Sequence, residues 1–221
     1  MVREPLYRSL FESGERYTVE KHEKNDDGTY TVTFENGFSG VFSADEYIKY
    51  DLFADGEENR HTYAELMHDV DFARCRGMAL SLAKASPKPS AAVRRTMLSK
   101  GFSDGIVDDA LEALTAEGEL DDSLFAERYA RAKAEKGKSS GSLVIRELEM
   151  KGVESDIAAK AVAKFFTDDE AVARELAVKK ARNGDSYEKT ARYLLSRGFR
   201  QGLVMDILEE VFQKSGCFRG T

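Results

Sequence analysis

The chain has 221 residues, of which 42% are hydrophobic and 33% are charged, and its formal net charge is −7. This composition is that of a folded chain, and no apolar run approaches the roughly 18 residues of a membrane span. The first 16 residues lack the apolar core of a signal peptide, and two cysteines, Cys75 and Cys217, make neither a disulfide framework nor a metal pattern. We therefore expect a cytoplasmic protein.

The charge is unevenly distributed along the chain. The first 70 residues hold 7 basic and 16 acidic residues, whereas the remaining residues hold 26 basic and 24 acidic ones. The acidity therefore belongs to the N-terminal third, and the overall charge does not exclude an anionic partner for the rest of the chain.

The N-terminal part has the alternating pattern of a β-sheet. Apolar residues recur at every second position in two stretches, Tyr17 and Val19, then Tyr30, Val32 and Phe34. The turn sequences NDDG (25–28) and NG (36–37) follow these stretches. We predict a small antiparallel sheet of about three strands that ends near Ser43, then a short helix within 44–53 and a solvated linker at 54–60.

Beyond the linker the chain repeats itself. Three basic–Gly pairs, at 100–101, 151–152 and 197–198, are spaced 51 and 46 residues apart. Positions +5, +6, +9, +10 and +13 after each Gly are apolar in every copy, which is the buried stripe of an amphipathic helix. These fifteen residues are Ile106, Val107, Ala110, Leu111, Leu114, Ile157, Ala158, Ala161, Val162, Phe165, Leu203, Val204, Ile207, Leu208 and Val211.

Each of these glycines also fits the C-terminal end of a helix. The residues four positions before and one position after each Gly are apolar, as in a Schellman cap, where Gly adopts the left-handed conformation. A further helix precedes each pair, for example at 122–136 and 167–182, and Thr167 with Glu170 matches a capping box. Each copy is therefore predicted to be helix, loop, helix, Gly cap and helix.

The predicted fold class is mainly α: tandem three-helix repeats in an elongated array, with a small N-terminal antiparallel β extension. The predicted boundaries are an extension at 1–60, three repeats at 61–118, 119–166 and 167–214, and a flexible tail at 215–221.

Patterns for catalysis and metal binding are weak. The Gly-Lys-Ser sequence at 137–139 matches the end of a phosphate-binding loop, but Ala132 occupies the position of the first Gly and the preceding residues are helical in composition. His61 and His68 lie two helical turns apart, too far to ligate one ion. We predict no catalytic residues, no cofactor and no metal site, and hence no enzyme.

The repeats carry a basic surface instead. Seven basic and three acidic residues lie between Arg128 and Lys151, enough to attract a polyanion or an acidic protein groove. An arginine also recurs six positions before each Gly and points away from the apolar face. A solvated face, or pairing with the helix dipole, is the alternative. The candidate contact residues are Arg128, Arg131, Lys133, Lys136, Lys138, Arg146, Lys151, Arg95 and Arg192.

Residues 118–153 resemble the central signature of the RecX family, regulators of the bacterial recombinase RecA. That signature has Leu-Asp-Asp, a Phe-Ala helix, a basic Gly-containing loop and a helix that ends in Leu-x-x-Lys-Gly, here at 120–122, 125–126, 137 and 148–152. The block around Pro89 and Ser90 is a looser match, and the similarity covers roughly 70–212. The N-terminal sheet resembles an extension found in some members only.

The resemblance implies tandem three-helix repeats and a non-enzymatic protein that lies in the groove of the RecA filament on DNA and restrains the recombinase in recombination and DNA repair. The implied partners are the RecA filament and single- or double-stranded DNA, with no membrane, and we expect a monomer. The acidic N-terminal third would then limit promiscuous DNA binding. Two alternatives remain open: a helical regulator that reads DNA sequence, and a helical-repeat scaffold that binds protein only.

Overall fold

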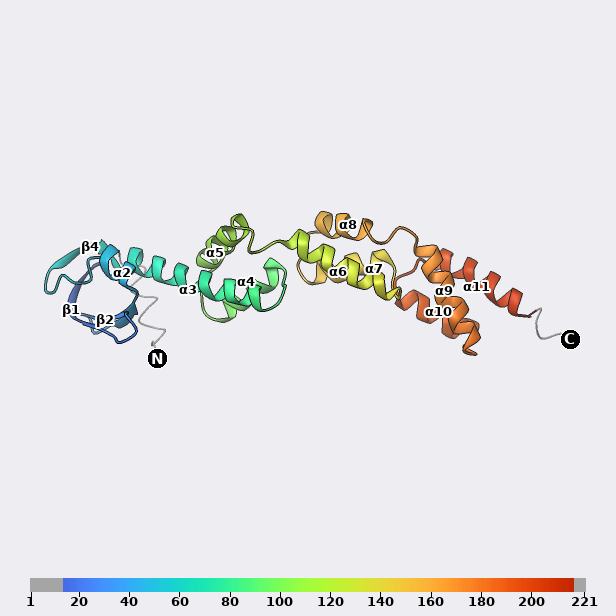
Figure 1. The fold of residues 1–221 in the computed structure, drawn as a ribbon, viewed down its shortest axis with the longest axis horizontal. Coiled ribbons are helices and arrows are strands. Elements are labelled where there is room, and N and C mark those ends of the chain that lie inside the picture. Colours follow the sequence, from blue (N-terminus) through green and yellow to red (C-terminus); the bar gives the residue numbers. More distant parts are fainter. Residues whose placement is uncertain (1–13, 217–221) are drawn as a thin grey trace. The chain divides into compact units, whose positions relative to one another are not determined.

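The structure is a computed structural model in which residues 14–216 are described (Figure 1). The described residues form four strands and ten helices. The strands are β1 (Arg16–Lys24), β2 (Tyr30–Phe34), β3 (Ser39–Phe42) and β4 (Glu58–Thr62). The helices are α2 (Ala44–Lys49), α3 (Tyr63–Ala85), α4 (Ser90–Ser99), α5 (Asp104–Ala116), α6 (Asp122–Lys136), α7 (Gly141–Met150), α8 (Ser155–Ala163), α9 (Asp169–Arg182), α10 (Tyr187–Ser196) and α11 (Gln201–Gly216). The predicted class, mainly helical with a small N-terminal antiparallel sheet, is confirmed.

The chain divides into two compact units. The first contains the residues up to Ser81 together with Met97–Leu114, and the second contains Leu82–Thr96 and the residues from Thr115 onward. The four internal boundaries expected from the sequence stay predictions. The expected tail at 215–221 lies mostly outside the described residues.

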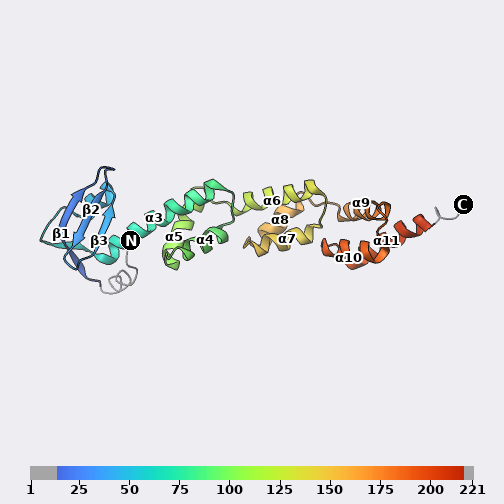
Figure 2. The ribbon, with the colours of Figure 1, turned by 90° about the horizontal axis from the view of Figure 1, so that it is seen from below.

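The N-terminal sheet has the strand order β3-β2-β1-β4, and each neighbouring pair is antiparallel. Figure 2 shows β1, β2 and β3 side by side. The prediction of three strands with a linker at 54–60 was wrong, because a fourth strand, β4, begins at Glu58 inside that linker and pairs with β1. Its sequence ENRHT has no apolar alternation, and Asn59 is its one buried residue. The Asn59 amide donates a hydrogen bond to the carbonyl oxygen of Tyr50 (2.9 Å), which satisfies this polar group inside the unit.

The core of the sheet includes the start of the first long helix. Tyr17 and Phe34 pack edge to face, with ring centroids 5.3 Å apart, and Tyr63 at the beginning of α3 packs on both. Leu66 and Val70 continue the contact along α3 and are almost fully buried. The sheet and the first two turns of α3 therefore share one apolar core, which anchors the helix to the extension.

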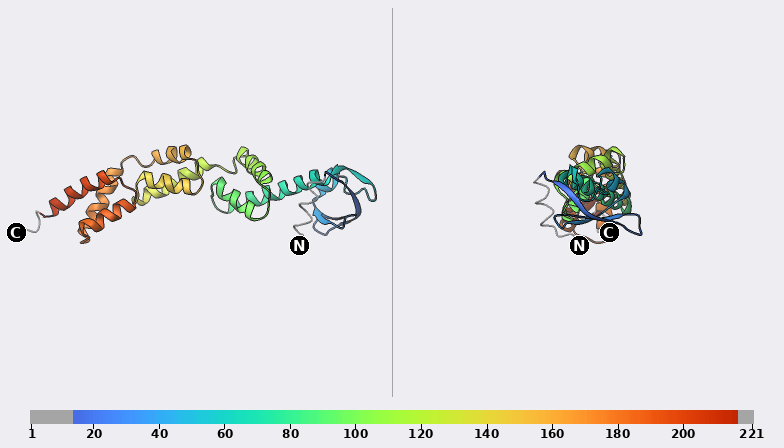
Figure 3. Two further views of the ribbon diagram at one scale, coloured as in Figure 1. Left: turned by 180° about the vertical axis from the view of Figure 1, so that it is seen from behind. Right: turned by 90° about the vertical axis from the view of Figure 1, so that its left-hand side faces the viewer.

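The second and third repeats each bury their helices against one another. Helices α6, α7 and α8 make mutual contacts, and so do α9, α10 and α11 (Figure 3). None of the fifteen apolar positions predicted to form the buried stripe is exposed. The prediction of a buried face in all three copies is therefore confirmed.

The glycines of the basic–Gly pairs end the middle helix of each repeat. Gly101, Gly152 and Gly198 have φ angles of +96°, +94° and +84°, which are left-handed values. In the second and third copies, the residue after Gly donates its N–H to the carbonyl five positions earlier, at 3.1 Å and 3.4 Å. The Schellman caps predicted from the sequence are confirmed in these two copies.

The first helices of the second and third repeats begin with aspartate caps. The side chain of Asp121 accepts a hydrogen bond from the backbone N–H of Leu124, and that of Asp168 accepts one from Ala171, each at 2.8 Å. The capping box predicted at 167–170 is wrong, because α9 has its cap one residue later, at Asp168. An aspartate at this position satisfies an N–H that the helix cannot pair itself.

Candidate nucleic-acid interface

Two of the basic–Gly pairs lie where one repeat meets the next, and we call each such contact a joint. At the first joint, a Cβ placed on Gly152 would overlap the Cβ of Ala91 in α4. At the second joint, a Cβ on Gly198 would lie 2.6 Å from both the Cβ of Leu143 and the Oγ of Ser140, at the start of α7. Glycine is therefore required at both joints by its left-handed φ and by the close approach of the neighbouring helix.

Hydrogen bonds fix the second joint. The backbone N–H of Ser140 donates to the carbonyl of Arg197 at 2.9 Å. The Ser142 hydroxyl donates to the carbonyl of Gly198 at 3.0 Å. The C-terminal end of α10 is thus held against the N-terminal end of α7, where the free carbonyls of one helix meet the free N–H and hydroxyl groups of another.

The joints bring basic residues of consecutive repeats together. A guanidinium nitrogen of Arg95 lies 3.8 Å from the position that a Cβ on Gly152 would occupy. Arg95 is therefore next to the Lys151–Gly152 pair. Arg146 follows Leu143 by one turn on α7, so it lies near the side of α7 that approaches Gly198, the residue after Arg197. All four side chains are exposed. We refer to Arg95, Lys151, Arg146 and Arg197 as the joint cations.

Tyrosine rings support two of the joint cations. The ammonium of Lys151 lies 5.4 Å from the centroid of the Tyr129 ring, and the guanidinium of Arg197 lies 5.1 Å from that of Tyr193. Such contacts restrict long side chains without neutralising them. These two charges therefore stay available to a ligand.

Helix α6 and the loop after it present four more of the predicted residues. Arg128, Arg131, Lys136 and Lys138 are all exposed, as predicted, while Ala126 and Ala130 on the opposite side of α6 are fully buried. The guanidinium of Arg131 lies 5.3 Å from the centroid of the Phe165 ring. The last predicted arginine, Arg192, is exposed on α10.

Lys133 differs from the other predicted residues, because it is engaged inside the repeat. Its ammonium lies 2.5 Å from the carboxylate of Glu147 on α7, which also accepts a hydrogen bond from the Tyr129 hydroxyl at 2.8 Å. Partial burial opposes ionisation of Glu147, but the hydrogen bonds from Lys133 and Tyr129 outweigh it and lower the pKa of this carboxyl. Lys133 therefore joins α6 to α7, and its charge is already compensated.

Two basic residues of this surface lie outside the set of candidate contact residues predicted from the sequence. Arg197 occupies in the third repeat the position of Lys151 in the second, so the repeat itself held the signal. Lys88 precedes α4 and lines a pocket together with Arg128. Nothing in the local sequence indicates that residues forty positions apart lie around one cavity.

The two histidines considered for metal binding have other neighbours. His61 lies 3.9 Å from the carboxylate of Glu65, and His68 lies 3.9 Å from that of Asp109. Over residues 14–216 no group of three or more His, Cys, Asp and Glu side chains is arranged to hold a metal ion. Within the same residues, no helix combines the length and apolar character needed to cross a bilayer.

Comparison with known proteins points to one family. The family model described as "RecX, second three-helix domain" matches residues 121–162, which include α6, α7 and most of α8. A protein of Haemophilus influenzae named "Regulatory protein RecX" is 30% identical over 122 residues, which cover 52% of this chain and 80% of that protein. A protein of the same name from Corynebacterium efficiens is 32% identical over 125 residues, which cover 51% of this chain and 60% of that protein.

Solved structures share the fold. A structure described as "Crystal structure of regulatory protein RecX" superposes with a TM-score of 0.66 at 16% identity and covers 87% of this chain and 99% of its own. The structure of RecX from Lactobacillus salivarius gives a TM-score of 0.58 at 20% identity, over 66% of this chain and 99% of its own. At these identities the likeness concerns the arrangement of helices.

Proposed function

The chain belongs to the RecX family, and from that membership we propose that it regulates a RecA recombinase filament by binding the filament and its DNA. The observation that carries the DNA part of the proposal is the placement of the joint cations. Two pairs of exposed cations, Arg95 with Lys151 and Arg146 with Arg197, recur at consecutive joints of the repeat array. A polyanion with regularly spaced charges, such as a DNA backbone, suits such a recurrence.

The proposed mechanism needs binding and no bond-making step. Phosphate contacts position a protein on DNA and carry no sequence information. A protein held along the filament in this way would hinder the changes that RecA undergoes as it hydrolyses ATP and exchanges strands. The exposed residues Arg128, Arg131, Lys136 and Lys138 extend the basic surface, and Arg192 continues it on α10. Lys133 is excluded from direct contact because Glu147 holds it.

A sequence-reading regulator fits the helix starts less well. A recognition helix reads base edges with Arg, Asn or Gln near its N-terminus. The helices after each Gly begin with Asp104 in α5, with Ser155 and Asp156 in α8, and with Gln201 and Gly202 in α11. The carboxylates at the start of α5 and of α8 would repel the DNA phosphates beside the major groove.

The experiment that tests the proposal is a titration of this protein into RecA on single-stranded DNA, with ATP hydrolysis as the readout. We expect the hydrolysis rate to fall as the protein is added. An unchanged rate at saturating protein would contradict regulation of RecA. A gel shift with DNA at low salt, without RecA, distinguishes the proposed function from a scaffold that binds protein only. Such a scaffold would leave the DNA unshifted.

A further inference from the structure

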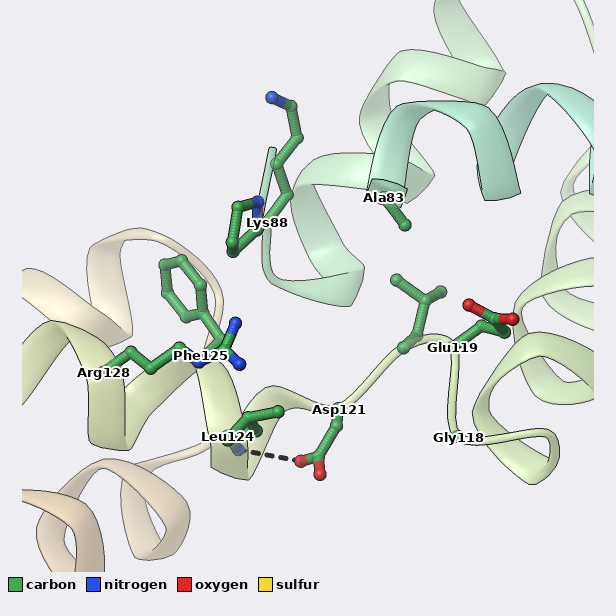
Figure 4. A pocket seen from close by; sticks show the side chains of 10 residues that line it. Ala83, Lys88, Gly118, Glu119, Asp121, Leu124, Phe125 and Arg128 are labelled. Atoms are coloured by element: carbon green, nitrogen blue, oxygen red, sulfur yellow. Dashed lines mark hydrogen bonds between the residues drawn. The ribbon is translucent and has the colours of Figure 1, made fainter. Parts of the chain in front are cut away.

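A pocket of about 120 Å³ lies in the second unit, where the segment before α4 meets the start of α6 (Figure 4). Lys88, Phe125 and Arg128 lie on one side of it, and Glu119 and Asp121 lie on the connecting segment that forms the other side. The pocket therefore has a basic, aromatic side and an acidic side. The joint cations do not line it.

The two cations of the pocket are free to bind a ligand. Among residues 14–216, neither Lys88 nor Arg128 has an ion-pair partner. Arg128 is exposed and Lys88 is half-buried. Figure 4 shows the Lys88 side chain directed away from Arg128, so an anionic group at Arg128 would be attracted by Lys88 only at longer range.

The same side of the pocket offers apolar and aromatic surface. Phe125 is half-buried, and its ring stacks on that of Tyr129, with centroids 6.1 Å apart. Leu124, in the preceding position of α6, is 46% exposed at the rim. An aromatic ring within one turn of an arginine is the combination with which proteins hold single-stranded nucleic acid, the ring for a base and the cation for a phosphate.

The acidic side limits what the pocket can hold. Glu119 lies 3.2 Å from the ammonium of Lys84, and Asp121 accepts the hydrogen bond from the N–H of Leu124 that caps α6. Both carboxylates have these roles in the fold, and their charge would repel a second phosphate. The pocket therefore suits one nucleotide rather than a length of backbone.

We propose that this pocket takes one unpaired nucleotide of single-stranded DNA, with its phosphate at Arg128, its base against Phe125, and Lys88 adding attraction at longer range. This inference rests on the DNA binding proposed above and goes beyond it. The joint cations need only phosphates, whereas the pocket needs a base that is free of its complement.

The test compares an oligothymidine with an abasic oligomer of the same length, each bound to the full chain and followed by fluorescence anisotropy. The abasic oligomer has the phosphates without the bases. In the wild-type chain we expect the oligothymidine to bind more tightly. Phe125→Leu should reduce this preference by at least about fivefold, the lower end of the contribution of one stacked base. Arg128→Ala and Lys88→Ala should weaken binding of both oligomers by similar factors.

Phe165→Leu is the matched control, because Phe165 is another half-buried aromatic residue of the same repeat but lies outside the pocket. It should leave the preference for bases unchanged. Leu124→Asn provides a second variant for the case in which Phe125→Leu fails to fold, since Leu124 is not part of the buried core. It should also reduce the preference, because the rim loses its apolar surface.

Two results would overturn the pocket proposal. In the first, the pocket variants keep the melting temperature and the base preference of the wild type. In the second, they bind DNA normally but lose their effect on RecA, which would assign the pocket to a protein partner. Either result leaves the proposed regulation of RecA standing. A wild-type chain that binds neither oligomer would contradict the DNA part of both proposals.

Discussion

The carboxylate of Asp122 accepts two hydrogen bonds from Ser90, one from its backbone N–H at 2.7 Å and one from its hydroxyl at 3.1 Å. Ser90 begins α4 and Asp122 begins α6, so this contact joins the middle helix of one repeat to the first helix of the next. Asp169 makes the corresponding contact to the N–H of Gly141 at 3.0 Å. In each pair of consecutive aspartates, the first therefore caps its own helix and the second caps a helix of the preceding repeat.

We predict that Asp122→Ala lowers the free energy of unfolding by about 1–3 kcal/mol, because it leaves the partly buried N–H of Ser90 without its charged acceptor. Asp122→Asn should cost less, since the amide oxygen can still accept. Urea denaturation measures the stability of both variants. Asp156→Ala is a suitable control, because among the described residues Asp156 pairs only with Lys160 on the same exposed face of α8 and joins no two repeats. Equal stability of Asp122→Ala and the wild type would contradict the role given to this residue.

Three left-handed cap glycines should differ in their response to alanine. Gly152→Ala and Gly198→Ala introduce both a left-handed alanine and an overlap with the neighbouring helix, whereas a Cβ on Gly137, which caps α6, meets no atom within 4 Å among the described residues. We expect Gly137→Ala to cost about 1–2 kcal/mol for the conformation alone. The other two should cost roughly 1–3 kcal/mol more because of overpacking. Chemical denaturation of the three variants decides this, and equal losses would show that the joints tolerate a methyl group.

The Lys133–Glu147 pair should make stability dependent on pH in mild acid. The pKa of Glu147 is lowered in the folded chain, so its contribution is complete above the ordinary value near 4.5 and is lost as the pH falls through the folded pKa. Glu147→Gln should therefore reduce stability at neutral pH and flatten its decline below about pH 4.5. The measurement is the melting temperature of the wild type and of Glu147→Gln between pH 3 and pH 7. If the two melting temperatures change in parallel with pH, the Lys133–Glu147 pair is not the cause of the pH dependence.

Single replacements of the joint cations should change the salt dependence of DNA binding. If each contacts a phosphate, its change to Ala should reduce the slope of log K against log salt by about one unit, with a similar loss for every sequence. Arg95→Ala and Arg146→Ala should change stability by no more than about 0.5 kcal/mol. Lys160→Ala, an exposed cation of α8, should leave the slope unchanged. Unaltered slopes in all the joint variants would mean that these side chains are only solvated.

The repeated helices could be predicted because periodicity and cap chemistry are local. Positions +5 to +13 after each Gly hold the stripe of a helix, and the Gly itself marks the end of the helix before it. Strand β4 could not be predicted, since it is held by backbone pairing with β1 while its side chains are mostly polar. Tyr63 and Leu66 of α3 belong to the core of the sheet. Their place there depends on tertiary contacts, which the local sequence does not indicate.

The basic surface was predictable in composition but not in grouping. The sequence indicates that Arg95 and Arg146 point outward, and both are exposed. It does not indicate that Arg95 lies beside the Lys151–Gly152 pair, because that neighbourhood depends on how one repeat packs on the next. For the same reason Lys133 looks like any other exposed lysine until its pairing with Glu147 is known.

Replacing all four joint cations with Ala tests whether they hold the protein on the RecA filament, with inhibition of the DNA-dependent ATPase of RecA as the readout. The control variant replaces four exposed lysines outside the joints with Ala, namely Lys21, Lys24, Lys160 and Lys189. Both variants therefore lose the same charge. We predict that the concentration for half-inhibition rises roughly tenfold or more for the joint variant, and stays within about twofold of the wild type for the control. A joint variant that folds and inhibits RecA as well as the wild type would show that the joint cations do not carry the regulation of RecA.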